Sequence, residues 1–286
     1  MNSHYFPQYL LNKGIIKIED MAALLRKCAD TEPGICVLAL QQGLAAPDRL
    51  GPLMGMAEDE AVAALTEKGI LTADKVKELK EAETGKSLAF AEVLLEEKVM
   101  SLEELAEQLK AYAGKGSEPL FEALEKFRTA ELEEEYPLYK EFAELFISSL
   151  ARFMDTPAVV NICDMEPGMT ECDQTYIASQ SLIGDINLVT GVYASREVFL
   201  EMARSYSHED IPEVNEMATD SVTEFLNVLN GIYLVELSKR EVDADLDTPR
   251  FAENQEPLGN RQLLVRLETG LGGFILVMAA DEFIFG

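Results

Sequence analysis

Residues 220–231 read Asp-Ser-Val-Thr-Glu-Phe-Leu-Asn-Val-Leu-Asn-Gly, and their pattern indicates how the second half of the chain folds. The apolar residues of this stretch and those just beyond recur at helical spacing and should form one stripe that packs on a sheet: Val222, Phe225, Leu229, Ile232 and Tyr233. Asp220, Glu224 and Asn227 lie on another face. We therefore predict one helix over residues 213–238, with Glu224 and Asn227 both accessible to solvent.

The segments around this helix alternate between helical and strand patterns. Apolar spacing predicts helices over 137–154 and 196–206, and β-rich runs predict strands over 158–163, 175–183, 186–194, 241–247, 262–269 and 273–279. Tight turns at 184–185 and 270–272 make the strands that they join antiparallel. The order is a helix and three strands, twice over, and residues 184–189 resemble residues 272–277. We expect an internally duplicated α+β domain with two long helices on one face of an antiparallel sheet.

The long helix also carries the most informative polar residues. A carboxylate and an amide three residues apart on a helix, here Glu224 and Asn227, project side by side. The carboxylate can accept from a cation, and the amide can both donate to and accept from one water molecule. Such a pair is suited to reaching into the active site of another protein. His208 and Asp210 precede the helix, and we interpret them as loop and cap residues.

This half of the chain resembles the CheX, CheC and FliY-type chemotaxis phosphatases. That family carries an acidic or serine residue, then a Glu, an Asn three residues further on, and a proline roughly two dozen residues later. The matching residues here are Asp220, Glu224, Asn227 and Pro249, with the proline one position sooner than in the family pattern. Asn230, followed by a glycine, also fits. The resemblance covers residues 136–286.

The resemblance implies a protein-aspartyl-phosphate phosphatase, a hydrolase that dephosphorylates a CheY-like response regulator. It assigns catalysis to Glu224, which pairs with a lysine of the receiver, and to Asn227, which positions water; Asp220, Asn230 and Pro249 support them. This chain needs no cofactor or metal of its own, because the receiver brings the magnesium ion. The resemblance further implies a homodimer, and an exposed edge at the apolar strand 273–279 favours one.

The first long helix differs at the matching position. Its Glu144 is followed three residues later by Ile147, not by an asparagine. The chain therefore resembles the one-site CheX pattern more than the two-site CheC pattern. Two other classes stay open: a non-catalytic adaptor that docks a response regulator, and a sensor whose N-terminal half binds a partner or a nucleotide.

Residues 1–113 predict an all-helical repeat domain. Gly14, Gly43, Gly69 and Lys98 align in four similar segments, in which one helix ends, two apolar residues follow and another helix begins. Glycine can close a helix in the left-handed conformation. Ser101 with Glu104 makes a capping box, and Thr72 stands at another N-cap position.

These helix pairs resemble the N-terminal domain of type II secretion ATPases, some of which bind a cyclic dinucleotide through an Arg-Leu-Gly motif. Residues 49–51 read Arg-Leu-Gly, but Pro52 follows, and the next Gly-Ile-Leu comes too late for the motif. A packing or docking module is therefore favoured over nucleotide binding. Helix-breaking residues and an acidic run predict a linker over 114–135, followed by the phosphatase-like domain over 136–286.

The composition of the chain disfavours several classes of partner and ligand. The chain has 52 Asp and Glu against 24 Lys and Arg, a formal net charge of −28, which disfavours binding to nucleic acid or to anionic membranes. The four cysteines form no Cys-x-x-Cys pair and there are two histidines, a poor ligand set for zinc. Without a signal peptide or a long apolar run, we expect a cytoplasmic protein with reduced thiols.

Overall fold

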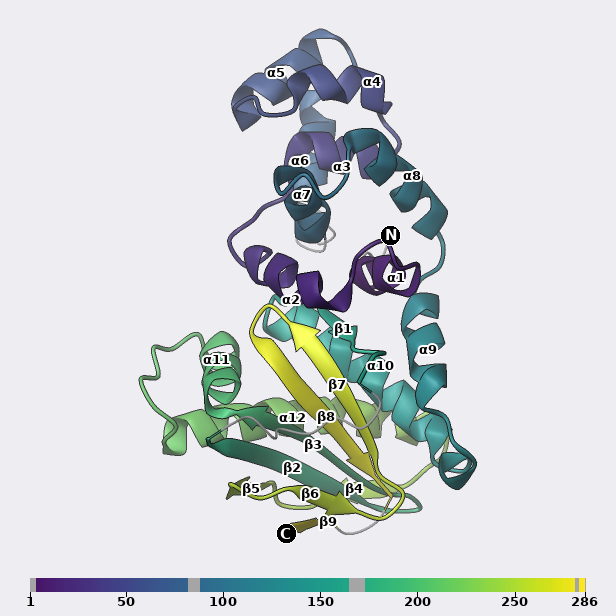
Figure 1. The fold of residues 1–286 in the computed structure, drawn as a ribbon, viewed down its shortest axis with the longest axis vertical. Helices are drawn as coiled ribbons and strands as arrows, with labels where there is room; N and C mark the ends of the chain where they lie inside the picture. Colours follow the sequence, from purple (N-terminus) through teal and green to yellow (C-terminus); the bar gives the residue numbers. More distant parts are fainter. Residues whose placement is uncertain (1–3, 82–87, 165–172, 281–282, 286) are drawn as a thin grey trace. The chain divides into compact units, whose positions relative to one another are not determined.

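The computed structural model describes residues 4–81, 88–164, 173–280 and 283–285. Contacts between residues divide the chain into two compact units, residues 1–119 and 120–286 (Figure 1). Within the described ranges, no helix is both long and apolar enough to span a bilayer.

The first unit consists of short helices. Their bounds are α1 Phe6–Asn12, α2 Ile18–Lys27, α3 Ile35–Gln41, α4 Pro47–Leu50, α5 Glu58–Glu67, α6 Ala73–Glu81, α7 Ala89–Glu96 and α8 Leu102–Tyr112. The α9 helix, Glu118–Leu124, crosses the boundary between the two units.

The four aligned turn positions of this unit share one backbone conformation. Gly14, Gly43 and Gly69 have φ of +67°, +67° and +65°, and Lys98 has φ of 55°. After each of them, the next amide donates to a carbonyl five residues earlier, as in the Ile15 N to Leu10 O bond of 3.0 Å. That bond closes the preceding helix. The predicted left-handed closure is confirmed, and the Lys98 turn makes the same bond without a glycine.

The predicted helix starts are also confirmed. Ser101 accepts from the Glu104 amide at 3.2 Å, and the Glu104 carboxylate accepts from the Ser101 amide at 2.7 Å, which is a complete capping box. Thr72 Oγ1 accepts from the Lys75 amide at 3.2 Å.

The second unit is an antiparallel sheet with helices. Its helices after α9 are α10 Tyr136–Phe153, α11 Arg196–Ser207 and α12 Glu216–Ser238. Its strands are β1 Ala158–Val160, β2 Thr175–Gly184, β3 Asn187–Ser195, β4 Ala244–Leu246, β5 Arg250–Glu253, β6 Pro257–Gly259, β7 Leu263–Thr269, β8 Gly272–Ala279 and β9 Phe283–Phe285. The expected α+β class is confirmed, but the structure also contains β5, β6 and β9, which the sequence pattern does not predict.

The strand order agrees with an internal duplication. It runs β1-β7-β8-β3-β2-β4, with β5 also paired to β2. Exchanging β1 with β4, β7 with β2, and β8 with β3 gives the same order read backwards. The two halves, each with its own long helix, therefore occupy equivalent places on either side of the central β3–β8 pair.

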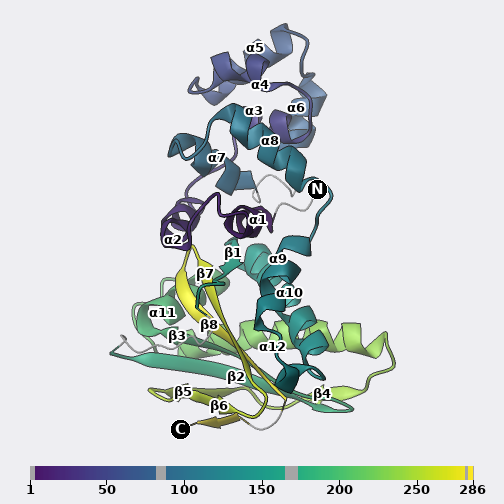
Figure 2. The ribbon, with the colours of Figure 1, turned by 45° about the vertical axis from the view of Figure 1, so that its right-hand side comes forward.

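The long helices α10 and α12 cover one face of this sheet (Figure 2). Phe146 of α10 contacts Phe225 of α12 and Phe274 of β8, with ring centroids 5.7 and 6.0 Å apart. The opposite face is apolar too and includes the buried Ile177, Tyr193, Ile275 and Val277. There β6 approaches β8, since a Cβ placed on Gly259 would lie 2.8 Å from that of Ala279.

The expected exposed edge at residues 273–279 is wrong. β8 lies between β7 and β3 and pairs with both along its length, so its backbone groups are already engaged. The sequence could not reveal this, because a hairpin turn identifies only one neighbour of a strand. The homodimer loses this argument and stays a prediction.

Residues 120–135, which include most of the expected linker, contact the rest of the second unit. Lys140 of α10 pairs with Glu125 at 3.0 Å and lies 4.4 Å from the centre of the Phe121 ring. Arg261 forms an ion pair with Glu135. The domain limits 1–113, 114–135 and 136–286 remain a prediction.

Candidate functional site

The helix that carries the predicted site forms as its sequence indicates. α12 starts at Glu216 and not at 213, because the side chain of Asn215 caps it by accepting from the Ala218 amide at 3.1 Å. Val222, Phe225, Leu229 and Tyr233 of the predicted stripe are buried, whereas Ile232 is only partly buried. This packing fixes which face of α12 is turned away from the sheet.

The predicted carboxylate–amide pair lies at the edge of that outward face. Asp220 and Glu224 are exposed, and Asn227 is partly buried at the border of the packed stripe. Asn227 Nδ2 donates to Glu224 Oε2 at 3.3 Å, so the two side chains are in direct contact. The Glu224 carboxylate is open to solvent, whereas the Asn227 amide also has a hydrogen-bond partner inside the protein.

Two residues on β2 and β3, which the sequence analysis does not predict as part of the site, lie beneath Asn227. Gln180 of β2 donates from Nε2 to Asn227 Oδ1 at 2.9 Å. Its Oε1 accepts from Asn230 Nδ2 at 2.8 Å, and Asn230 Oδ1 accepts from Thr190 Oγ1 of β3 at 3.0 Å. The signal in the sequence was a glutamine at an inward position of an otherwise apolar or small-residue strand.

The predicted supporting residues have different surroundings. Asn230 is fully buried in this hydrogen-bonded chain. Pro249 is partly buried and follows β4. Two residues before it, the Asp247 carbonyl accepts from Gln180 Nε2 at 3.0 Å. The glutamine thus contacts both the α12 helix and the loop that leads to Pro249.

Tyr206 of α11 is a further neighbour that the sequence did not indicate. Its ring meets that of Phe225 edge-on, with centroids 5.5 Å apart. Burial raises the pKa of Tyr206, and the negative charge of Glu224 raises it further. Both effects act against ionisation of the Tyr206 phenol.

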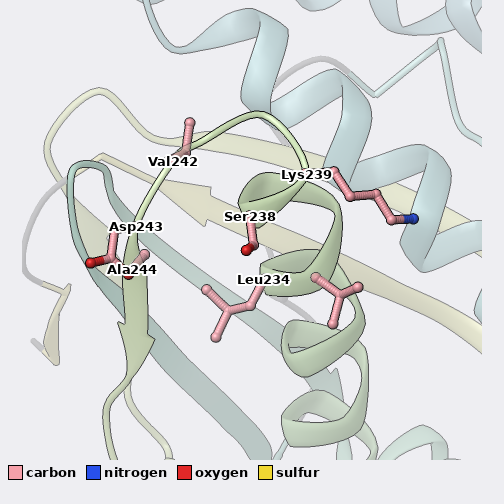
Figure 3. A pocket seen from close by; sticks show the side chains of 7 residues that line it. Leu234, Ser238, Lys239, Val242, Asp243 and Ala244 are labelled. Carbon is pink, nitrogen blue, oxygen red and sulfur yellow. The ribbon is translucent and has the colours of Figure 1, made fainter.

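One pocket in the described part of the fold lies apart from the predicted site. A shallow pocket at the C-terminal end of α12 is lined by Leu234, Val235, Ser238, Lys239, Val242, Asp243 and Ala244 (Figure 3). It contains none of the predicted site residues. Within the described part of the chain, no three His, Cys, Asp or Glu side chains are grouped closely enough to hold a metal ion.

The site therefore consists of a carboxylate and an amide on the rim of a helix, supported by a buried polar chain. Residues 176–262, which run from β2 through this helix to the residue before β7, match the family model described as chemotaxis phosphatase CheX. The resemblance to CheX-type phosphatases inferred from the sequence is confirmed for this segment.

Solved structures share limited similarity with the chain. A chemotaxis protein CheX from Desulfovibrio desulfuricans is 14% identical with a TM-score of 0.39, over 50% of this chain and 97% of that chain. CheX from Vibrio vulnificus is 14% identical with a TM-score of 0.37, over 48% and 92%. A CheX–CheY–BeF3–Mg²⁺ complex from Borrelia burgdorferi is 16% identical with a TM-score of 0.35, over 49% of this chain and 94% of that chain. No curated protein sequence matches the chain.

Proposed function

We propose that the second unit hydrolyses the aspartyl phosphate of a phosphorylated CheY-like response regulator. The observation that carries this proposal is the contact between Glu224 and Asn227 at the outward edge of α12, inside the segment that matches the CheX family. The resemblance of residues 1–113 to the N-terminal domain of type II secretion ATPases stays a prediction.

In this proposal the receiver supplies the phosphoryl group, a magnesium ion and a lysine. Glu224 pairs with that lysine, which draws α12 against the receiver's active site. The Asn227 amide orients a water molecule in line with the phosphorus. Water oxygen bonds to phosphorus, the bond from phosphorus to the aspartate oxygen breaks, and the products are inorganic phosphate and a free carboxylate. Positioning and charge are the main contributions a protein makes to phosphoryl transfer.

The placement of the pair suits a macromolecular substrate. An exposed carboxylate on a helix can enter a cleft in another protein, whereas a small molecule would need a cavity around it. The shallow pocket by Ser238 is lined by other residues.

The test is the decay of phosphorylated receivers. Each response regulator of the source organism is phosphorylated with acetyl phosphate and mixed with the full chain or with the Glu224→Ala, Asn227→Ala double variant. We expect faster decay of one receiver with the wild type and the intrinsic rate with the double variant. Glu144→Ala, on the first long helix, is the matched control and should behave as wild type.

Two results would contradict the proposal. Wild-type acceleration by the double variant would remove both residues from catalysis. Binding of a receiver without acceleration of its decay would favour the adaptor function instead.

A further inference from the structure

We infer that Gln180 is a positioning residue that sets the orientation of the Asn227 amide, with Asn230 and Thr190 holding Gln180 in turn. This inference rests on the proposed function of Asn227, and it adds residues from two strands that the helical motif does not contain. Gln180 is 2% exposed, and Asn230 and Thr190 are fully buried, so none of the three can contact a receiver directly.

The hydrogen bonds run in one direction. The Thr190 hydroxyl donates to Asn230 Oδ1 at 3.0 Å, and Asn230 Nδ2 donates to Gln180 Oε1 at 2.8 Å. Gln180 Nε2 donates to Asn227 Oδ1 at 2.9 Å. Each amide oxygen thus faces an amide or hydroxyl hydrogen, and rotating any one amide by half a turn would set oxygen against oxygen or NH2 against NH2.

This direction decides how Asn227 presents its two ends. Oδ1 is turned inward to Gln180, while Nδ2 is turned toward Glu224 Oε2 at 3.3 Å. An amide oxygen accepts two hydrogen bonds, so the bond from Gln180 still allows Oδ1 to accept from water. Without Gln180, the amide could turn over and exchange its donor and acceptor, and a water held by it would lose its alignment with phosphorus.

Gln180 also links the helix to the loop that carries Pro249. Both hydrogens of its Nε2 are used, one on Asn227 Oδ1 and one on the Asp247 carbonyl at 3.0 Å. A side chain with two donated bonds and one accepted bond has little freedom to rotate. Gln180 therefore fixes both the Asn227 amide and the start of the loop at Asp247.

The place of these residues argues against a purely structural role. Burying amides and hydroxyls is unfavourable unless every group is paired, and replacing both partners by apolar groups of the same shape can be nearly neutral or stabilising. Met278 pairs with Thr190 in the β3–β8 register and with Leu263 in the β7–β8 register. Apolar residues thus fill neighbouring positions of the same core, and the polar chain is confined to the part beneath Asn227.

The experiment compares three variants of the full chain. Gln180→Met keeps the length of the side chain and removes its hydrogen bonds. Thr190→Val removes the first donor of the chain. Thr269→Val is the matched control: Thr269 is also fully buried on a strand, but its hydroxyl donates locally to the Gly272 carbonyl at 2.8 Å. Thermal unfolding of each variant establishes that it is folded.

The first readout is steady-state decay of a CheY-type receiver phosphorylated with acetyl phosphate. We expect kcat to fall roughly tenfold or more in Gln180→Met and by a smaller factor in Thr190→Val, with KM almost unchanged, because only the reacting geometry is disturbed. Thr269→Val should retain the wild-type kcat. A folded Gln180→Met protein with wild-type kcat would overturn the inference and leave the proposed function intact.

The second readout does not need activity. The side-chain NH2 signals of Asn227 in a nitrogen-15 NMR spectrum, assigned with Asn227→Ala, report the surroundings of that amide. We expect them to shift or broaden in Gln180→Met and in Thr190→Val, and to keep their positions in Thr269→Val. Unchanged Asn227 signals in both test variants would overturn the inference even if no receiver is a substrate.

Discussion

The helices α10 and α12 occupy equivalent places on the sheet, yet their polar residues do different things. Aligning Glu144 with Glu224 puts Ile147 opposite Asn227 and Leu150 opposite Asn230. Ile147 is 1% exposed and Leu150 is fully buried, so the α10 positions belong to the core. In α12 the same two positions carry amides, and both of them hydrogen-bond to the side chain of Gln180.

The surroundings of a Glu-x-x-Asn pattern on a helix depend on the residues that lie beneath that helix. On α10 a carboxylate is present at Glu144, but the two matching positions that follow are the buried apolar Ile147 and Leu150. On α12 the buried chain from Thr190 pairs the inward end of Asn227. The two halves of the duplicated fold therefore differ in whether these positions are apolar or hydrogen-bonded amides.

The largest expected effect is on the α12 side of the comparison. Asn227→Ala should lower kcat for receiver dephosphorylation roughly a hundredfold or more, because one positioned group of the reacting geometry is lost. Receiver binding, measured by calorimetry, should stay near the wild-type value. Glu224→Ala should weaken both binding and rate, since it removes the partner of the receiver's lysine. Equal losses of binding in the two variants would contradict these separate roles.

Introducing an asparagine at Ile147, the α10 position that matches Asn227, tests whether α10 can hold a second site. Ile147→Asn should lower the free energy of unfolding by about 3 kcal/mol, because a buried apolar side chain is lost and an amide without a partner is introduced. Urea denaturation followed by circular dichroism measures this. A loss below about 1 kcal/mol, or a gain of phosphatase rate, would mean that α10 can accommodate a second site after all.

A smaller effect is expected where the two helices meet. Glu141 of α10 accepts two hydrogen bonds from Arg240, just after α12, at 2.9 and 2.8 Å. Both side chains are nearly half exposed, so Glu141→Ala should reduce stability by less than about 1 kcal/mol. The same variant compared at low and high salt should show a smaller difference at high salt. A loss of several kcal/mol would show that this pair fixes the helices together.

The smallest effect is predicted for Glu144, the residue of α10 that aligns with Glu224. Glu144 is partly exposed, and Glu144→Ala should change the unfolding free energy by less than about 0.5 kcal/mol and leave kcat unaltered. Melting curves and receiver decay measured side by side check both statements. A clear loss of rate would make α10 a second functional helix, as in the two-site pattern.

Much of the second unit could be predicted because its signals are local. Helical spacing of apolar residues located α10 and α12, and tight turns located the β2–β3 and β7–β8 hairpins. One error arises because the neighbours of a strand in the sheet need not be its neighbours along the chain. The strand 273–279 was expected at an edge and lies in the centre, because its pairing with β3 joins segments far apart in sequence.

The α+β class, the outward face of the long helix and the pairing of Glu224 with Asn227 could be predicted from the sequence, because each depends on spacing within one helix or hairpin. The polar groups that lie beneath that pair became known from the three-dimensional fold alone. Gln180 and Thr190 reach α12 from strands far away in the chain, and their bonds exist only because β2 and β3 pass under the helix in one register. Long-range register places Gln180 and Thr190 there, and spacing within the helix cannot predict it.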